Sequence, residues 1–273
     1  MLAPLLLFAL AFGQLAPAPG TRVPREFVQR VRDALVRDYS LQEQFTYIER
    51  RRDVKISRLG KVTIGPLRTF EVYPSQHPGR TYKRLIAVDG KPLSPEELAR
   101  RDAEHQRDLK KAAERTRSED ATERAERLAE DARDDHRRDA VLADAMAVFQ
   151  PTYAGRETIA GRTVVVADVK PNADARVTTR EGRWAKKFAG RIWVDAANYQ
   201  IVKIDMRAIE DVTIGWGVIG RIHAGSRVLV ERQRFEDVWL PASLTYEASG
   251  RTLLFRTFQF AATTTYSNYK RAR

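Results

Sequence analysis

The last third of the chain constrains the fold most, because it is a succession of short segments in which apolar and polar residues alternate. Residues 191–195 alternate, 196–200 form a predicted turn, and 201–206 run back in the opposite direction. Strands of period two that are joined by short turns pair antiparallel. The pattern predicts a curved antiparallel sheet or an open barrel, whose inner face is a place for a ligand. Further alternating segments are 227–234, 242–248 and 253–260.

A helix and more strands are predicted before this region. Residues 25–39 carry apolar side chains at spacings of three and four, with charged residues opposite them, which predicts an amphipathic helix. A stripe of this kind packs on a sheet, and the alternative is a lid or a helix that contacts a membrane. The mixture of elements indicates an α+β protein. The additional predicted strands are 45–56, 61–64, 68–73, 82–88 and 162–170.

A long charged helical insertion is predicted at residues 94–149. Ser94, Pro95 and Glu97 form a capping box with proline at the first helical position, and no Gly or Pro follows until Pro151. Poor helix formers between 116 and 122 favour a break there. Apolar residues are dense only at the end of the insertion, so most of it is expected to be a solvated arm. The alternative is a helix that docks a protein partner or covers a cavity.

Composition narrows the function classes. The chain has no cysteine, which excludes disulfides, thiolate metal sites and a lipid anchor on a cysteine. The net charge is +12, but residues 96–139 contain 12 basic and 15 acidic residues, which leaves +15 for the rest. A basic body suits anionic membrane surfaces or nucleic acid. For an exported protein we expect the partner to be an anionic membrane surface and not nucleic acid. A general preference for arginine in the proteome would give the same excess of positive charge.

Residues 1–19 have the character of a signal peptide. An apolar core at 5–12 is followed by small residues and prolines, although no Lys or Arg precedes the core. We therefore expect a soluble periplasmic protein with residues 20–273 as a single domain. The alternatives are a frayed apolar end or an uncleaved anchor.

Motifs for catalysis and cofactors are weak. Residues 215–220 match Gly-x-Gly-x-x-Gly, but the dinucleotide motif needs a helix next, and 221–234 is a predicted strand. A Gly-rich loop at the rim of a barrel is the preferred interpretation. The histidines are too far apart in sequence for a local metal pair. Glu71 and Asp195 lie on predicted strands and are expected to face outward. We expect no enzyme activity, no metal and no cofactor.

Candidate ligand-binding residues are the apolar side chains that alternation places on one face of the late strands, together with a tryptophan in the Gly-rich loop. In a filled sandwich these side chains would form the core, and in an open half-barrel they would line a hydrophobic cavity. The pattern is compatible with both. The candidate residues are Val202, Ile204, Met206, Trp216, Leu244, Tyr246, Phe258 and Phe260.

Several of these segments resemble the LolA/LolB-like periplasmic superfamily, in particular a poorly characterised bacterial subfamily of outer membrane lipoprotein-sorting-like proteins. The likeness lies in the strand Arg191-Ile-Trp-Val-Asp195, the turn after it, the return strand with Val202-Lys203, and Val238-Trp-Leu-Pro241. The resemblance implies an incomplete antiparallel barrel, a LolA-like half-barrel covered by helices, with acyl chains bound in a hydrophobic cavity. The inserted helix departs from the family pattern, and the missing cysteine excludes a LolB-like anchored acceptor.

These observations lead to two functional hypotheses. The first is a periplasmic carrier that binds or transports a lipid or a lipoprotein acyl group, with a possible approach to anionic membranes. The alternative is an envelope protein-interaction or stress-sensing module on the same scaffold, which uses residues 94–149 to engage a protein partner.

Overall fold

The computed structural model describes residues 18–42, 44–57, 61–74, 81–214, 220–252 and 257–272. The helices of this described part are α1 (Arg25–Gln42), α2 (Pro95–Ser118), α3 (Ala121–Val148) and α4 (Arg180–Ala185). The strands are β1 (Phe45–Ile56), β2 (Val62–Tyr73), β3 (Tyr82–Val88), β4 (Lys91–Pro92), β5 (Phe149–Ile159), β6 (Arg162–Pro171), β7 (Phe188–Asp195), β8 (Ile201–Ala208), β9 (Val212–Ile214), β10 (Gly220–Ile222), β11 (Arg227–Phe235), β12 (Val238–Thr252) and β13 (Thr257–Arg271). The predicted signal peptide falls almost entirely on residues 1–17, which lie outside the described residues.

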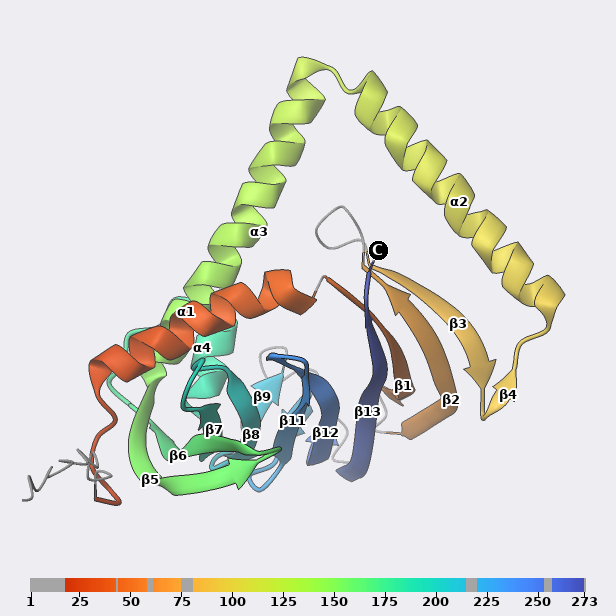
Figure 1. Ribbon diagram of the computed structural model, residues 1–273. Helices are drawn as coiled ribbons and strands as arrows, with labels where there is room; N and C mark the ends of the chain where they lie inside the picture. Colours follow the sequence, from red (N-terminus) through yellow and green to blue (C-terminus); the bar gives the residue numbers. More distant parts are fainter. Residues whose placement is uncertain are drawn as a thin grey trace, which may run out of the picture.

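The strands form one large antiparallel sheet that is not closed. Its order is β4-β3-β2-β1-β13-β12-β11-β8-β7-β6-β5, and the short β10 pairs with β12 and β9. The sheet is bent into a trough, and its two outer strands, β4 and β5, lie at opposite ends of the order (Figure 1). The α+β class is therefore confirmed, and the antiparallel sheet is curved and open.

Helix α1 lies across the concave side of the trough, over β6 to β8 (Figure 1). Its inner side buries Val31 and Ala34. The helix forms there because apolar residues recur at helical spacing and meet the apolar face of the strands beneath them. Its partner at the same end of the trough is the base of α3, where Val148 is fully buried.

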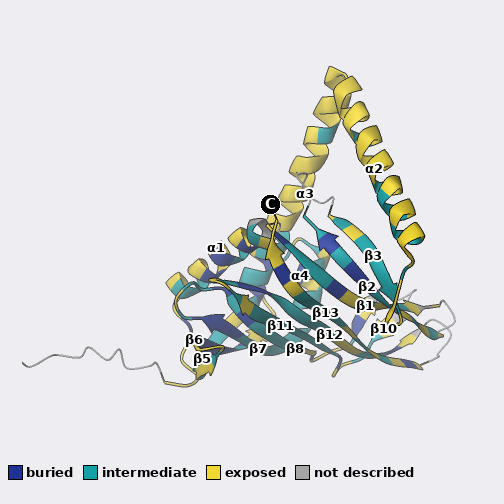
Figure 2. Ribbon diagram, turned by 45° about the vertical axis from the view of Figure 1, so that its right-hand side comes forward, coloured by how far each residue is buried: buried dark blue, intermediate teal, exposed yellow. Residues whose placement is uncertain are grey.

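The two helices of the insertion form an arm above the trough. The expected capping box is present, with Ser94 accepting from the backbone N–H of Glu97 at 3.2 Å. The expected break is also present, because α2 ends at Ser118 and Asp120 caps the start of α3. Figure 2 shows that most of both helices is exposed. No helix within the described residues combines the length and the apolar character that a membrane crossing requires.

The arm is attached at both of its feet. At the base of α2, Asp102 accepts two hydrogen bonds from Arg84 of β3, at 2.7 and 2.8 Å. At the base of α3, the buried Asp144 accepts from the backbone N–H and the hydroxyl of Thr179, both at 2.7 Å. Helix α4 approaches so closely that a Cβ on Gly182 would lie 2.8 Å from the Cβ of Asp144. Glycine at position 182 is therefore required for this contact.

A buried polar network joins α1 to the end of the sheet. Asp38 of α1 accepts from the amide of Gln200 and from the guanidinium of Arg232, each at 2.5 Å. The side-chain carbonyl of Gln200 accepts from the backbone N–H of Trp239 at 3.2 Å. The indole N–H of Trp239 donates to Asp195 at 2.9 Å. The network holds four parts of the chain together in the interior.

Asp195 does not face outward as expected, since only 1% of its surface is exposed. It ends β7 and accepts from the backbone N–H of Ala197 in the turn, so it closes the turn instead of continuing the alternation. Burial alone would raise the pKa of Asp195, but hydrogen bonds from Arg162 and Trp239 outweigh it and hold the pKa below its ordinary value.

Replacing Trp239 with Phe tests the network. The substitution keeps an aromatic ring but removes the N–H that donates to Oδ2 of the buried Asp195, and this oxygen then keeps only its hydrogen bond from Arg162 at 3.0 Å. We expect the free energy of unfolding to fall by about 1–3 kcal/mol, measured by urea denaturation. The control is Trp184→Phe, because Trp184 donates no indole hydrogen bond within the described residues. Equal effects of the two substitutions would contradict the role of the indole N–H.

The carboxylates with lowered pKa values predict acid sensitivity. Hydrogen bonds from Arg227 lower the pKa of Asp205, and Asp195 is lowered as described above. Between their folded pKa values and the ordinary 3.8, the unfolded chain binds more protons than the folded one, so stability rises with pH in that window. We expect the contribution of these groups to be constant above that window and lost below it. Urea midpoints measured at pH 7, 5 and 3 check this, and Asp205→Asn should flatten the decline.

Candidate ligand-binding cavity

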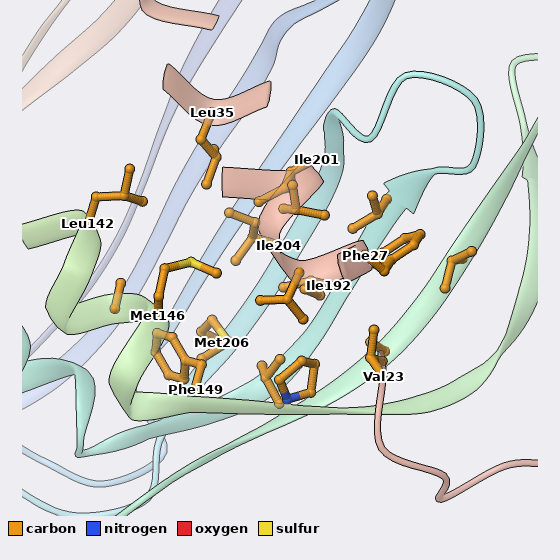
Figure 3. A pocket seen from close by; sticks show the side chains of 18 residues that line it. Val23, Phe27, Leu35, Leu142, Met146, Phe149, Ile192, Ile201, Ile204 and Met206 are labelled. Atoms are coloured by element: carbon orange, nitrogen blue, oxygen red, sulfur yellow. The ribbon is translucent and has the colours of Figure 1, made fainter. Parts of the chain in front are cut away.

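An apolar cavity lies between α1, the base of α3 and the concave face of β6, β7 and β8. Its volume is about 260 Å³. Figure 3 shows the lining side chains converging from the helix above and the strands below. All of the lining residues are apolar. They are Val23, Phe27, Val28, Val31, Leu35, Leu142, Ala145, Met146, Phe149, Pro151, Val165, Ala167, Val169, Ile192, Val194, Ile201, Ile204 and Met206.

The local sequence patterns explain how these side chains converge. In α1, residues 27, 31 and 35 are spaced by four and lie on one face of the helix. In β6, alternate residues from Val165 to Val169 point to the concave side. Ala167 pairs with Ile192 of β7, and Ile192 pairs with Ile204 of β8, so one row of apolar side chains crosses all three strands.

A second, more open groove lies further along the same face. It has a volume of about 440 Å³ and is lined by both apolar and charged residues. Val228 lines this groove and pairs directly with Met206, which lines the apolar cavity. Phe188 of β7 and Val54 of β1 line it from distant strands, so the bend of the sheet brings its two walls together there. The concave face therefore has an apolar end beneath α1 and a more polar end further along.

The strand register places six of the eight candidate residues on this concave face. Met206 pairs with Val228 and Val228 with Tyr246, while Ile204 reaches Leu244 through Val230 in the same way. Phe260 and Phe258 follow on β13, opposite Ala248 and Gly250 of β12. Of the six, Ile204 and Met206 line the apolar cavity, and Tyr246 and Phe260 line the more polar groove. Leu244 and Phe258 line neither.

Val202 does not share a face with Ile204 as the alternation predicted. A bulge in β8 sets Val194 opposite Ile201 but Trp193 opposite Lys203, so one extra residue is inserted. Val202 therefore faces the other side of the sheet and is buried in the core. Its cluster there consists of Val164, Val166, Trp193 and Trp239. Trp216, the remaining candidate, lies outside the described residues.

Sequence reasoning missed most of the cavity wall. The apolar stripe of α1 and the apolar end of α3 were expected to pack on the body, but neither was assigned to a ligand site. The signal was present in the density of apolar residues around Leu142 and Met146, in an otherwise charged segment. Residues 162–170 are predicted as a strand, but none of their side chains is predicted to line a ligand site.

No group of three metal-ligating side chains lies together within the described residues. The described lining of the apolar cavity contains no hydroxyl, carboxylate, imidazole or amine. A lining of this kind is suited to bury apolar groups.

Comparisons with known proteins add little to this geometry. No protein-family model matches the chain, and no curated protein matches it by sequence. Among solved structures, there is a similarity to a crystal structure of a DUF1329 family protein from Desulfovibrio piger, with 10% sequence identity and a TM-score of 0.27. It covers 89% of this chain and 92% of the other. A likeness at this TM-score supports no functional conclusion, so the function has to be argued from the cavity.

Proposed function

We propose that the chain is a binding protein, not an enzyme, and that it carries a lipid or lipoprotein acyl chain in the cavity beneath α1. On this proposal the open, helix-covered sheet is a half-barrel of the LolA type. The protein would act in the periplasm after removal of residues 1–19, and its basic body would favour approach to anionic membranes.

The observation that carries the proposal is the apolar cavity itself. Its volume of about 260 Å³ and its apolar lining leave apolar side chains without packing partners, which costs stability. Smaller apolar cavities, of about 150 Å³, stay dry and bind benzene. An acyl chain would recover part of this cost, at about 0.8 kcal/mol per buried methylene.

Release of such a cargo needs no covalent step. The acyl chain exchanges one apolar environment for another, so the free-energy difference between this cavity and a membrane or a second carrier is small.

The same proposal predicts a bound acyl group in the protein as it is isolated. We expect native mass spectrometry of the periplasmically expressed protein to show a stoichiometric adduct, which lipid extraction then identifies. In Ala145→Leu the added side chain fills the cavity, so the adduct should be lost while the free energy of unfolding stays the same or rises by about 0.5–2 kcal/mol.

The matched control is Ala147→Leu, two residues along the same helix at an exposed position. This variant should keep the adduct. An adduct-free wild-type protein that also fails to bind added phospholipid would contradict the proposal, as would retention of the adduct in a folded Ala145→Leu protein.

The second candidate function is a protein-interaction module, and the exposed arm favours it. Leu109 and Leu128 are 43% and 54% exposed on α2 and α3. Long helices that bury so little of their own surface in the fold are suited to contact another molecule.

Replacing the middle of the arm separates the two functions. Residues 107–138 are exchanged one for one with Gly and Ser, which keeps the contacts of Asp102 and Asp144 at the two feet. We expect acyl binding to remain within about twofold, because the cavity lies beneath α1 and touches only the base of α3. The measurement is displacement of the neutral probe N-phenyl-1-naphthylamine by dodecanol. Loss of binding in a folded variant would show that the arm is part of the binding site.

A further inference from the structure

A basic mouth adjoins the apolar cavity. A surface pocket of about 490 Å³ is lined by three arginines, Arg22, Arg25 and Arg32, together with Gln29 and apolar residues. No carboxylate is among the described residues that line it. The residues that it shares with the apolar cavity are Val23, Val28, Met146, Phe149 and Pro151. The mouth therefore lies directly beside the cavity, with these five side chains in contact with both.

The three arginines are exposed and are not neutralised, and the backbone beside the first of them is fixed. Arg22 forms an isolated bridge with Thr152 beside β5, and the backbone N–H of Val23 donates to Pro151 at 3.1 Å. Arg25 begins α1, and Arg32 lies two turns further on. None of the three forms an ion pair or side-chain hydrogen bond with the described residues. By contrast, Arg30 of the same helix donates to the hydroxyl of Tyr199 at 2.7 Å.

The positive charge of Arg25 is unfavourable for the N-terminus of α1, where this residue begins the helix. The N-terminus of a helix carries a partial positive charge, so arginine in the first turn is unfavourable and acidic residues are preferred. Glu26 is the one acidic residue of the first turn of α1, and it does not line the pocket. An anion in the mouth would be favoured both by the three guanidinium groups and by the helix.

We propose that the mouth binds the anionic head of the molecule whose chain fills the cavity, so that the ligand is an anionic amphiphile bearing a phosphate or a carboxylate. This inference rests on the proposed function and makes it more specific. Arg22, Arg25 and Arg32 bind the head by charge-assisted hydrogen bonds, and Phe149 and Met146 lie where the head ends and the chain begins.

The test compares ligands that have the same chain and different heads. Dodecyl phosphate, dodecanoate and dodecanol each displace N-phenyl-1-naphthylamine from the full chain at pH 8 and low salt. We expect the two anions to bind at least about tenfold more tightly than dodecanol, and high salt to reduce the difference. Inorganic phosphate alone, followed by calorimetry, should bind at least about tenfold more weakly than dodecyl phosphate.

The matched variants assign the preference to the mouth. In the triple variant Arg22→Gln, Arg25→Gln, Arg32→Gln, the preference for anions should disappear while dodecanol binds as before. The control carries Arg115→Gln, Arg124→Gln and Arg133→Gln on the exposed arm and should keep the preference.

The outcomes separate this inference from the proposed function. Equal binding of anions and dodecanol by the wild type would overturn the inference and leave the proposed function in place. A preference that persists in the triple variant, or free phosphate that binds as well as dodecyl phosphate, would also overturn the inference. Absence of dodecanol binding to the wild type would instead overturn the proposed function itself.

Discussion

The buried contact of Asp38 with Gln200 and Arg232 is the interaction on which the rest of the site depends. A charged pair in the interior is expensive to desolvate, and it is tolerated only when its hydrogen bonds are well placed. Removing one partner would leave the other as an unpaired buried charge or polar group. The contact therefore fixes the position of α1 along the sheet far more strictly than the apolar stripe of the helix does, since apolar packing tolerates sliding. Because α1 is the roof of the cavity, this polar contact helps to position one wall of the cavity.

The same network gives a physical meaning to the sequence pattern that resembles the LolA/LolB-like proteins. Asp195 ends the strand of that pattern, Gln200 ends its turn, and Trp239 belongs to the later Val-Trp-Leu-Pro segment. In the structure these three side chains meet, and Gln200 continues the chain of hydrogen bonds to the helix. The pattern thus encodes how the helix is attached to the sheet. None of these three side chains lines the cavity, whereas Ile192 and Val194 of the same strand do.

Features that depend on neighbouring residues could be predicted from the sequence. Features that depend on contacts between distant segments could not. The capping box before α2 and the alternation of the late strands act over a few residues, and both appear in the structure. The bulge that turns Val202 away from the concave face inserts one residue opposite β7, and alternation within β8 alone contains no sign of it. Asp195 was assigned outward by the same alternation, but its donors come from distant segments. The cavity wall combines α1, α3 and β6, which only the fold brings together.

The two edges of the open sheet connect its architecture to the proposed ligand site. Edge strands expose unpaired backbone groups, and proteins protect such edges with short strands or with covering segments. One edge ends in the two-residue β4, beside the foot of α2, where His105 stacks on Tyr82. The other edge, β5, is covered by residues 20–23, whose backbone pairs with Pro151 and Tyr153. This covering segment is also the one that carries Arg22 and leads into α1. The contact that protects the edge of the sheet therefore also holds the charged mouth against the apolar cavity, so the position of the mouth depends on an ordinary structural requirement of an open sheet.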